Sequence, residues 1–470
     1  MSKTTAIVLA AGKGTRMKSD IPKVLHHVAG APMIDHVVQA ALDAGADDAV
    51  VVVGHRRDLV ETHLAERFGD RVRTAVQAEQ KGTGHAVICA LPELGDATTA
   101  LLLYGDTPLV RSDDLQRLVE VRGDAKVALI TCHVPEPKGY GRILRAGGVV
   151  TAIREQRDCD ADQLKIAEVN PGMYAVDVGF LREALDALTP DNDQGELYLT
   201  DIVSMAAKRR SVADCDADHR TLVGVNDRSQ LAAAEDDLYR RIGNDLRRAG
   251  CTIRSSARID VGVEVGSDAI VEHNVVLRGK TRIGPKARID VGCVLEDVEV
   301  ATEAYLKPYT VASEAKIGER AQAGPFAHLR PQSQLDEEAK IGNFVEMKKT
   351  RLRKGAKASH LAYLGDGDVG ENANIGAGTI FCNYDGFQKH KTTIEAGAFI
   401  GSDSQIVAPV TIGAGAYVGT GTTVTKDVPA DALAIGRAKQ ANKEGYATRL
   451  RGRMKAAKEA AQKKSAEEKP

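Results

Sequence analysis

Residues 394–424 read Ile394-Glu-Ala-Gly-Ala-Phe-Ile400-Gly-Ser-Asp-Ser-Gln-Ile406-Val-Ala-Pro-Val-Thr-Ile412-Gly-Ala-Gly-Ala-Tyr-Val418-Gly-Thr-Gly-Thr-Thr-Val424. An aliphatic residue returns at every sixth position, and glycine often follows it. This period predicts the hexapeptide pattern of a left-handed parallel β-helix. In that fold each hexad forms one flat side of a triangular coil, and the periodic residue points into a narrow core.

The same period extends toward the N-terminus. Its earlier positions are Val265, Val271, Leu277, Ile283, Ile289, Leu295, Ala301, Ile317, Ala323, Leu329, Leu335, Ile341, Met347, Val369, Ile375 and Phe381. Glycine-rich disorder is disfavoured, because each coil needs only its neighbours to bury its core and many coils are present. The period is interrupted at 351–365 and 382–391. Both stretches are predicted to be loops that leave the coil, where binding residues often lie.

Residues 1–227 follow a different pattern, in which apolar runs alternate with amphipathic segments. Strands are predicted at 6–9, 49–53, 100–104, 127–131 and 173–178, and helices at 33–44 and 113–121. This alternation favours a Rossmann-like α/β domain with a mostly parallel sheet, whose ligands bind at the carboxyl ends of the strands. A single helix over 228–250 is predicted to link this domain to a β-helix domain at 251–438.

Composition excludes several classes of protein. The net charge of -2 gives no global case for nucleic-acid binding, and no apolar run is long enough to span a bilayer. The seven cysteines lack paired spacing, so reduced thiols in the cytoplasm are the simplest interpretation. Residues 439–470 hold ten Lys or Arg against four Glu, which predicts a solvated, disordered basic tail.

The first predicted strand runs into Leu9-Ala-Ala-Gly-Lys-Gly-Thr-Arg-Met17, and Lys23 follows six residues later. A Gly-rich turn lets backbone N–H groups approach a phosphate chain, and the cations Arg16 and Lys23 offset its charge. The spacing matches neither the dinucleotide-binding nor the Walker motif. The loop therefore predicts a phosphate site of another kind.

Other polar residues follow the predicted strands of this domain. Asp106 ends a strand, and it is suited either to hold Mg²⁺ or to cap a helix; Asn226 is a second oxygen ligand or a cap for the linking helix. The stretch 77–85 offers amide groups for a base edge. The turns near Gly141, Glu155 and Asn170 either line a sugar pocket or serve only as turns.

In the second half, polar residues concentrate near the interruptions of the period. His360 is suited to accept the proton that an amine releases when it is acylated, although a plain surface histidine fits the local sequence as well. Arg330, Lys348 and Lys389 are cations that the coil could bring around one phosphate, or they are ordinary surface charges.

Taken in order, these motifs resemble one family. The stretches at 9–23, 80–85, 104–106, 139–142, 155, 170–172, 195–201 and 225–226, followed by the hexapeptide region, are similar to the bacterial bifunctional N-acetylglucosamine-1-phosphate uridylyltransferases / glucosamine-1-phosphate N-acetyltransferases. The resemblance covers roughly residues 5–440. It implies a cytoplasmic homotrimer that takes UTP, acetyl-CoA and Mg²⁺ and supplies UDP-N-acetylglucosamine for peptidoglycan and lipopolysaccharide precursors.

The resemblance also implies roles for residues of the first half. Arg16 and Lys23 are catalytic, and Asp106 and Asn226 hold the metal. The implied contacts to UTP and to UDP-N-acetylglucosamine are Leu9, Ala10, Ala11, Gly12, Lys23, Gln77, Gly82, Thr83, Tyr104, Gly105, Asp106, Gly141, Glu155, Asn170 and Asn226.

For the second half the resemblance implies that His360 is the general base of acetyl transfer. The implied contacts to glucosamine-1-phosphate are Arg330, Lys348, Tyr363, Asn374 and Lys389. Those implied for acetyl-CoA are Ala377, Asn383, Tyr384, Ser402, Thr420 and Arg437. Thr420 departs from the family pattern, in which a smaller alanine is expected.

Two other functions compete with this interpretation. One is a sugar-1-phosphate nucleotidylyltransferase whose β-helix is purely structural or regulatory, which predicts no catalytic histidine in the second half. The other is a non-catalytic scaffold, which predicts degraded phosphate and metal residues in the first half. The dense polar stretches at 360–363 and 383–389 argue against the first, and the presence of Lys23, Asp106 and Asn226 argues against the second.

Overall fold

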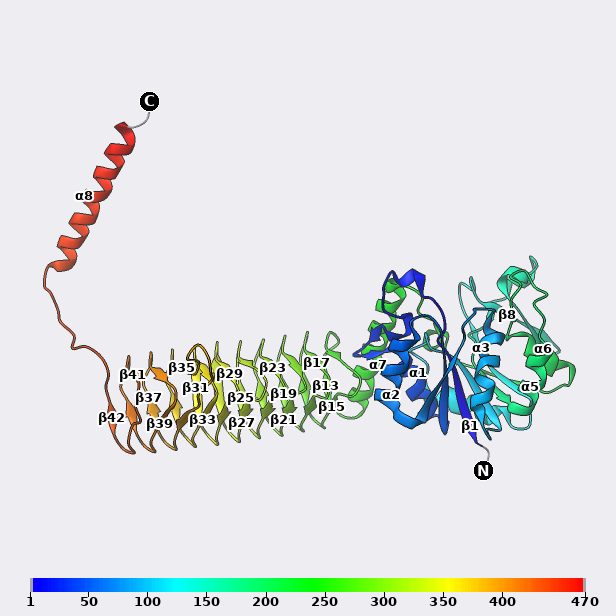
Figure 1. The fold of residues 1–470 in the computed structure, drawn as a ribbon, viewed down its shortest axis with the longest axis horizontal. Helices are drawn as coiled ribbons and strands as arrows, with labels where there is room; N and C mark the ends of the chain where they lie inside the picture. Colours follow the sequence, from blue (N-terminus) through cyan, green and yellow to red (C-terminus); the bar gives the residue numbers. More distant parts are fainter. Residues whose placement is uncertain (1–2, 468–470) are drawn as a thin grey trace. The chain divides into compact units, whose positions relative to one another are not determined.

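The computed structural model describes residues 3–467, and the chain forms two compact units, Met1–Glu314 and Ala315–Pro470. The first unit contains an α/β domain, a long helix and the first coils of a β-helix (Figure 1). The second unit contains further coils and a C-terminal helix. No helix within 3–467 is long and apolar enough to cross a membrane.

The α/β domain is built on one ten-stranded mixed sheet, in the order β5-β4-β1-β6-β11-β7-β10-β8-β9 with β12 beside β7. Its strands are β1 (Thr4–Leu9), β4 (Asp48–Val53), β5 (Val72–Val76), β6 (Thr99–Tyr104), β7 (Val127–His133), β8 (Gly141–Ala146), β9 (Val149–Arg154), β10 (Glu168–Asn170), β11 (Tyr174–Asp177) and β12 (Val212–Asp216). The short strands β2 (His27–Val28) and β3 (Ala31–Pro32) form a separate ribbon.

The sheet is less parallel than the sequence predicts. The pairs β4–β5, β1–β4, β1–β6 and β7–β12 are parallel, whereas β11 runs antiparallel to both β6 and β7, and β10, β8 and β9 are also paired antiparallel. Strand periodicity reports which faces are buried, not strand direction. The parallel half nevertheless places the ends of β1, β5 and β6 at one edge of the sheet.

Helices cover both faces of this sheet, which makes three layers. They are α1 (Met33–Asp43), α2 (Arg57–Phe68), α3 (Thr83–Ala90), α4 (Ser112–Arg122), α5 (Val178–Asp186) and α6 (Asp201–Lys208). Along β1 the side chains alternate: Val8 packs in the core shared with α1, α2 and α4, and Ile7 in the core shared with α3, α5 and α6. The α/β prediction is confirmed.

Helix α7 (Arg228–Arg248) begins at Asp227, whose side chain accepts a hydrogen bond from the backbone N–H of Gln230. It packs against the first coil of the β-helix, where the Tyr239 hydroxyl donates to Asp260 at 2.9 Å. The backbone N–H of Val261 donates to Ala29 of the α/β domain. The helix and the first coil are therefore tied to the domain by packing and by specific hydrogen bonds.

In the hexapeptide region of the first unit, short parallel strands form the sides of each coil. They are β13 (Thr252–Ile253), β14 (Arg258–Ile259), β15 (Glu264–Val265), β16 (Ile270–Val271), β17 (Val276–Arg278), β18 (Arg282–Ile283), β19 (Arg288–Ile289), β20 (Val294–Glu296), β21 (Glu299–Val300), β22 (Tyr305–Leu306) and β23 (Val311–Ser313). Ile270 pairs with Arg288 in the next coil, an offset of one eighteen-residue turn.

The second unit continues this pattern. Its strands are β24 (Lys316–Ile317), β25 (Gln322–Ala323), β26 (His328–Leu329), β27 (Gln334–Leu335), β28 (Lys340–Asn343), β29 (Glu346–Lys348), β30 (Arg351–Leu352), β31 (Lys357–His360), β32 (Tyr363–Gly365), β33 (Gly367–Val369), β34 (Asn374–Ile375), β35 (Ile380–Cys382), β36 (Thr392–Ile394), β37 (Phe399–Ile400), β38 (Gln405–Val407), β39 (Val410–Ile412), β40 (Tyr417–Val418), β41 (Thr423–Val424) and β42 (Leu433–Ala434). The left-handed parallel β-helix is confirmed.

The structure corrects the predicted period at two places. Val300, not Ala301, fills the core position, because the step after Leu295 is one residue short and Ile283 pairs with Val300. The stretch 351–365 stays in the coil: a similar short step places Leu352 in the core, and Ala358 and Leu364 follow at full spacing. The predicted loop there is wrong.

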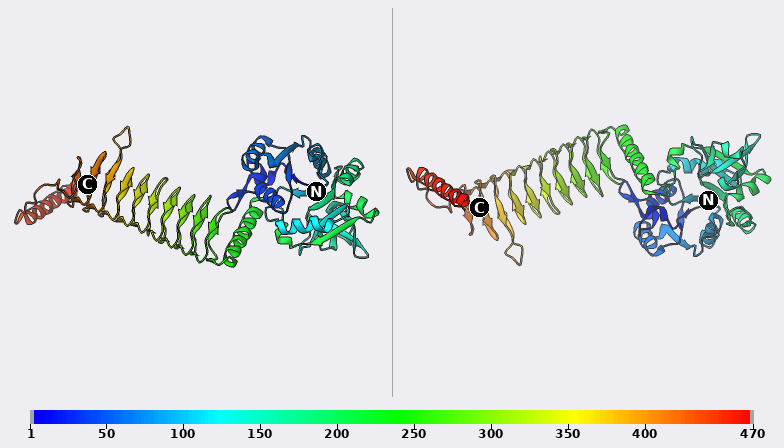
Figure 2. Two further views of the ribbon diagram at one scale, coloured as in Figure 1. Left: turned by 90° about the horizontal axis from the view of Figure 1, so that it is seen from below. Right: turned by 90° about the horizontal axis from the view of Figure 1, so that it is seen from above.

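The second interruption is a loop that leaves the coil, as predicted, and Figure 2 shows it projecting from the stacked strands. Tyr384 and Lys389 form an isolated antiparallel bridge within it. In the C-terminal segment the structure differs from the predicted disorder and has α8 (Tyr446–Glu467). This segment is rich in Ala, Lys, Arg and Glu, which are strong helix formers, so a solvated helix forms without burying a core.

Candidate active sites

A cavity of about 250 Å³ lies at the carboxyl ends of β1, β5 and β6. Backbone and side chains of the first loop form one wall, the segment 77–83 forms another, and the end of β6 closes the site. The predicted residues that line it are Leu9, Ala10, Ala11, Gly12, Lys23, Gln77, Gly82, Thr83, Tyr104 and Asp106. The structure therefore brings ten of the predicted nucleotide contacts together.

Lys23 and Asp106 of this lining belong to a group of cations and oxygens whose other members, Arg16 and Asn226, lie outside the lining. The Lys23 ammonium forms an ion pair with Asp106 and donates to Asn226 Oδ1 at 3.1 Å, and Arg16 donates to the same oxygen at 2.8 Å. The carboxylate of Asp106 and the amide oxygen of Asn226 therefore converge on one cation. Mg²⁺ prefers such oxygen ligands and usually completes its shell with phosphates and water, so this pair fits a magnesium site. Among residues 3–467, no cluster of three or more His, Cys, Asp or Glu side chains is arranged to hold a metal.

Hydrogen bonds hold the second wall in shape. The Gln77 amide donates to the carbonyl of Gly82 at 3.1 Å, and Gln80 donates to the carbonyl of Ala11 at 2.7 Å. Gly82 has φ +102°, and a Cβ there would lie 2.6 Å from the carbonyl oxygen of Leu197, so only glycine fits. The turn thus combines a rigid backbone with an amide near the cavity.

Gly141, Glu155 and Asn170 lie together on the antiparallel side of the sheet, outside the lining of this cavity. Asn170 is paired with Gly141, and a Cβ on Gly141 would lie 3.5 Å from Glu155 Oε1. Thr200 donates to Glu155 at 3.2 Å, and burial raises the pKa of that carboxyl group. Burial also raises the pKa of Tyr104, with the charge of Glu155 as the next cause.

The lining includes four residues absent from the predicted contacts: Val24, Gln80, Ala86 and Glu196. Gln80 could have been found, because it begins the polar turn already singled out. Glu196 lies in the motif stretch 195–201, which was noted for the resemblance but given no role at the site. Gly105 donates its backbone N–H to Leu9 at 2.9 Å and so joins the ends of β1 and β6.

In the second unit, His360 is the last residue of β31 and is paired with Asn343 of the preceding coil. Its Nδ1 lies 2.7 Å from Asn343 Oδ1. Because an amide oxygen only accepts, Nδ1 carries the proton and Nε2 keeps its lone pair. His360 is thus oriented as a base. Asn343 was missed, because the short step before Leu352 makes the offset between Asn343 and His360 seventeen residues and not the eighteen of a regular turn.

Basic and phenolic residues lie on the neighbouring side of these coils. Arg330 follows β26 and donates its backbone N–H to Met347, which places it beside Lys348 one coil on. Its guanidinium donates to Glu346 at 2.8 Å, and Glu346 is paired with Tyr363. Adjacent coils are about 4.8 Å apart, so these groups form one short polar strip.

The remaining predicted residues lie on later coils. Asn383 donates to Asp366 at 2.5 Å, and Lys389 lies 5.0 Å from the centre of the Tyr384 ring. Asn374 is paired with Lys357, which lies three residues before His360. Within one chain, Asn374 is therefore not the neighbour of His360 in the next coil.

The last predicted acetyl-CoA contacts follow in order along the coils. Ala377 accepts from the backbone of Asp403 at 2.7 Å, Ser402 accepts from Gly421 at 2.9 Å, and Arg437 donates to the carbonyl of Thr420. Within the single chain these residues therefore form an extended strip along successive coils.

Comparison with known proteins agrees with both halves of this description. A family model described as a MobA-like NTP transferase domain matches residues 6–195, and one described as bacterial transferase hexapeptide (six repeats) matches residues 391–426. The chain is thus an enzyme with a nucleotidyltransferase domain and a hexapeptide-repeat transferase domain.

Relatives match nearly the whole length of the chain. The "Bifunctional protein GlmU" of Sorangium cellulosum is 63% identical over 96% of this chain and 97% of its own length. Those of an Anaeromyxobacter species and of Acinetobacter baumannii are 51% and 45% identical, each over 94% of this chain and over 92% and 98% of their own lengths. The chain belongs to the family of bifunctional GlmU proteins, which confirms the family inferred from the motifs.

Proposed function

We propose that this enzyme catalyses two consecutive steps of UDP-N-acetylglucosamine synthesis. The C-terminal half transfers the acetyl group of acetyl-CoA to glucosamine-1-phosphate, and the N-terminal half transfers the uridylyl group of UTP to N-acetylglucosamine-1-phosphate. We assign these reactions to residues 251–438 and 1–227, with 228–250 as the linker. The observation that carries this proposal is the group formed by Lys23, Asp106 and Asn226 at a cavity, in a family whose matches span both transferase regions.

For uridylyl transfer, an oxygen of the sugar phosphate attacks the α-phosphorus of UTP, and the bond to the pyrophosphate oxygen breaks. This chemistry depends mainly on positioning two anions and offsetting their charge. Backbone N–H groups at 9–12 would cradle the phosphates, Gln77, Gly82 and Thr83 would hold the nucleoside, and Arg16 and Lys23 would stabilise the charge on the leaving pyrophosphate. Gly141, Glu155 and Asn170 would hold the amino sugar.

Asp106 and Asn226 are the residues we propose to hold Mg²⁺. The support is their convergence on the single ammonium of Lys23. When bound, the ion would neutralise phosphate oxygens and polarise the reacting phosphorus. Lys23 would then be free to turn toward the phosphates.

For acetyl transfer, the neutral amine of glucosamine-1-phosphate attacks the thioester carbonyl, the C–S bond breaks, and coenzyme A leaves as the thiolate, which finally takes up the proton that the amine released. We assign the proton released by the amine to Nε2 of His360, because the pairing with Asn343 leaves that nitrogen as the acceptor. The strip that contains Arg330, Lys348 and Tyr363 would hold the sugar phosphate, together with Asn374 and Lys389. Acetyl-CoA would lie along Ala377, Asn383, Tyr384, Ser402, Thr420 and Arg437.

The assembly we propose is a homotrimer in the cytoplasm. Exposed apolar side chains support association: Phe326, Phe344 and Leu361 occupy corners of successive coils and are 49%, 56% and 59% exposed. The Phe326 and Phe344 rings stack with centroids 5.6 Å apart. The extended form of the acetyl-CoA strip also agrees with a site completed by another copy. All seven cysteines are free, as expected of a reducing compartment.

Two variants of the full-length chain test the assignment. With glucosamine-1-phosphate, acetyl-CoA, UTP and Mg²⁺ supplied, free thiol and pyrophosphate are followed separately; the uridylyl step is also assayed with N-acetylglucosamine-1-phosphate. Asp106→Ala is expected to abolish pyrophosphate release from that sugar and to spare thiol release, and His360→Ala the reverse. Asp124→Ala and His273→Ala, at exposed positions, are matched controls. Normal acetylation by His360→Ala, or loss of both activities in folded Asp106→Ala, would refute the roles given to these residues.

A further inference from the structure

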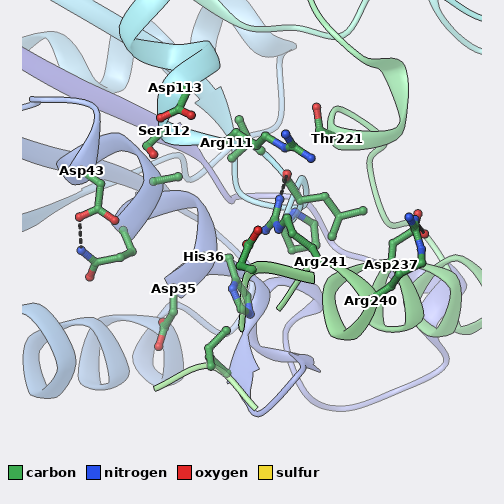
Figure 3. Close-up of a pocket in the computed structure, with 18 of the residues that line it drawn as sticks. Asp35, His36, Asp43, Arg111, Ser112, Asp113, Thr221, Asp237, Arg240 and Arg241 are labelled. Atoms are coloured by element: carbon green, nitrogen blue, oxygen red, sulfur yellow. Dashed lines mark hydrogen bonds and ion pairs between the residues drawn. The ribbon is translucent and has the colours of Figure 1, made fainter. Parts of the chain in front are cut away.

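A second and larger cavity, of about 710 Å³, lies in the first unit, and Figure 3 shows residues that line it. Its walls come from α1, the segment 108–113, the short 3₁₀ helix His219–Thr221, α7, and Val261 and Gly262 of the first coil. The lining shares no residue with the nucleotide cavity. Cavities of 300–1,000 Å³ are of the size that holds small-molecule ligands.

Most charges in this lining are neutralised by a nearby partner. Arg220 binds Asp218 at 2.7 Å, Arg248 binds Asp245 at 2.9 Å, and Arg240 binds Asp237. A fourth arginine of the lining, Arg67, is 3.6 Å from Asp35. Local ion pairs therefore account for four of the six arginines.

Arg111 and Arg241 differ from these four. Arg241 donates to the carbonyl of Leu109 at 2.8 Å and binds no carboxylate within 3–467, and the side chain of Arg111 has no hydrogen bond or ion pair in that range. Burial lowers the pKa of Arg241, and the charge of Arg111 lowers it further, while Asp245 and Asp237 act in the opposite sense. Arg111 and Arg241 therefore line the same cavity, and neither guanidinium is paired with a carboxylate within 3–467.

The surroundings of this pair suit an anion. Ser112 is the first residue of α4, and no side chain caps this helix, so its first backbone N–H groups are open to a ligand. Six aspartates line the cavity beside the six arginines; four of them form the ion pairs above, and Asp43 and Asp113 are paired with no arginine within 3–467. Arg111 and Arg241 are therefore the two arginines of the lining that lack a carboxylate partner.

We propose that this cavity binds a small organic phosphate, with its phosphate group between Arg111 and Arg241. Guanidinium groups donate paired hydrogen bonds that match phosphate oxygens, and the rest of the cavity has room for the organic part. Binding would also relieve the repulsion between the two cations.

Two segments that line this cavity are close in sequence to the candidate metal ligands. Arg111 lies five residues after Asp106, and Thr221 lies five residues before Asn226. The backbone N–H of Val225 donates to the carbonyl of Asp106 at 2.8 Å, which joins the two segments. A phosphate that draws Arg241 away from Leu109 would loosen the loop that carries Asp106. The proposal therefore predicts that ligand binding in this cavity changes the affinity of the nucleotide cavity for UTP.

The test measures binding and activity in the full chain. Equilibrium dialysis with radiolabelled inorganic phosphate compares the wild type with Arg111→Ala, Arg241→Gln, Arg248→Ala and Lys23→Ala. Loss of one charged hydrogen-bond partner is expected to weaken phosphate binding at this site about tenfold or more in the first two variants. Arg248→Ala is the matched control, since its guanidinium is already paired, and Lys23→Ala removes phosphate binding at the nucleotide cavity.

Phosphate is also expected to shift the KM for UTP in the wild type, and less in Arg111→Ala. Wild-type phosphate affinity in Arg111→Ala and Arg241→Gln, or equal loss in Arg248→Ala, would overturn the proposal. So would a KM for UTP that responds to phosphate to the same extent in wild type and Arg111→Ala. Thermal melting confirms that each variant is folded; Arg111 is exposed, so its removal leaves the core intact.

Discussion

Replacement of Gly172 by alanine is expected to damage uridylyl transfer through the ring of Tyr104. Gly172 has φ +89°, in the region that favours glycine. Its backbone N–H donates to Asn170 Oδ1 at 3.0 Å, and Tyr104 lines the nucleotide cavity. The residue therefore connects the proposed sugar contacts to the proposed nucleotide contacts.

The size of the effect follows from the contact. A Cβ on Gly172 would lie 2.1 Å from Tyr104 Cε2, whereas carbon atoms pack best about 3.5–4.0 Å apart. The ring or the turn must therefore move by about 1 Å or more, and a displacement of about 1 Å at an active site costs on the order of 100-fold in rate. Backbone strain at positive φ adds about 1–2 kcal/mol of lost stability.

A second glycine variant distinguishes the effect of backbone strain from the effect of the contact with Tyr104. Gly45 has φ +97°, and a Cβ there would meet nothing within 4 Å, so Gly45→Ala carries the strain alone. Pyrophosphate release by Gly172→Ala is expected to fall about 100-fold, and both variants are expected to keep normal thiol release. If uridylyl rates were equal in Gly172→Ala and Gly45→Ala, the contact with Tyr104 would not matter and the reasoning would be wrong.

Two further predictions concern single side chains. Asn343→Ala is expected to lower kcat for acetylation about tenfold with little change in KM, because the imidazolium formed in the transition state loses its hydrogen-bond acceptor. Asn343→Asp keeps an acceptor and should restore most of the rate. Full activity of Asn343→Ala would contradict the positioning role of Asn343. Burial raises the pKa of Glu155, so the folded state holds this proton more tightly than the unfolded chain and loses stability as pH rises through that pKa. Glu155→Gln removes the buried charge and keeps an acceptor for Thr200, so its melting temperature should exceed that of the wild type at pH 8. This difference in melting temperature should shrink toward pH 4, where Glu155 is protonated. Calorimetry that finds the same difference at both pH values would exclude burial of the charge as the cause.

Much of the fold could be predicted because its pattern is local. In a β-helix each core position depends on the residue six places away and on the coil above and below, so Ile394 through Val424 were placed correctly. The errors occurred where a step lost one residue, at Val300 and at Leu352, because a period counted along the chain does not report where a corner is tightened.

The candidate sites also combine features that the sequence showed with contacts that only the structure shows. The phosphate loop and the polar turn at 77–85 were visible as motifs. Their contacts were not: Asn226 was noted as an oxygen ligand, but its hydrogen bond to Lys23 spans more than two hundred residues, and Glu196 enters the same cavity from a motif that was given no role. His360 was visible as a suitable base, but only the register of β28 and β31 shows that Asn343 fixes its tautomer.

By itself, the sequence determined the two architectures, their order along the chain and the chemistry of the phosphate loop, since short-range periodicity and backbone geometry are written in neighbouring residues. The tertiary structure decided which polar groups meet. It brought Asp106 and Asn226 onto one ammonium and placed Arg111 and Arg241 in the lining of one cavity between separate segments. The physical reason is that electrostatic contacts depend on distance in space, which strand order and helix packing set and local patterns do not.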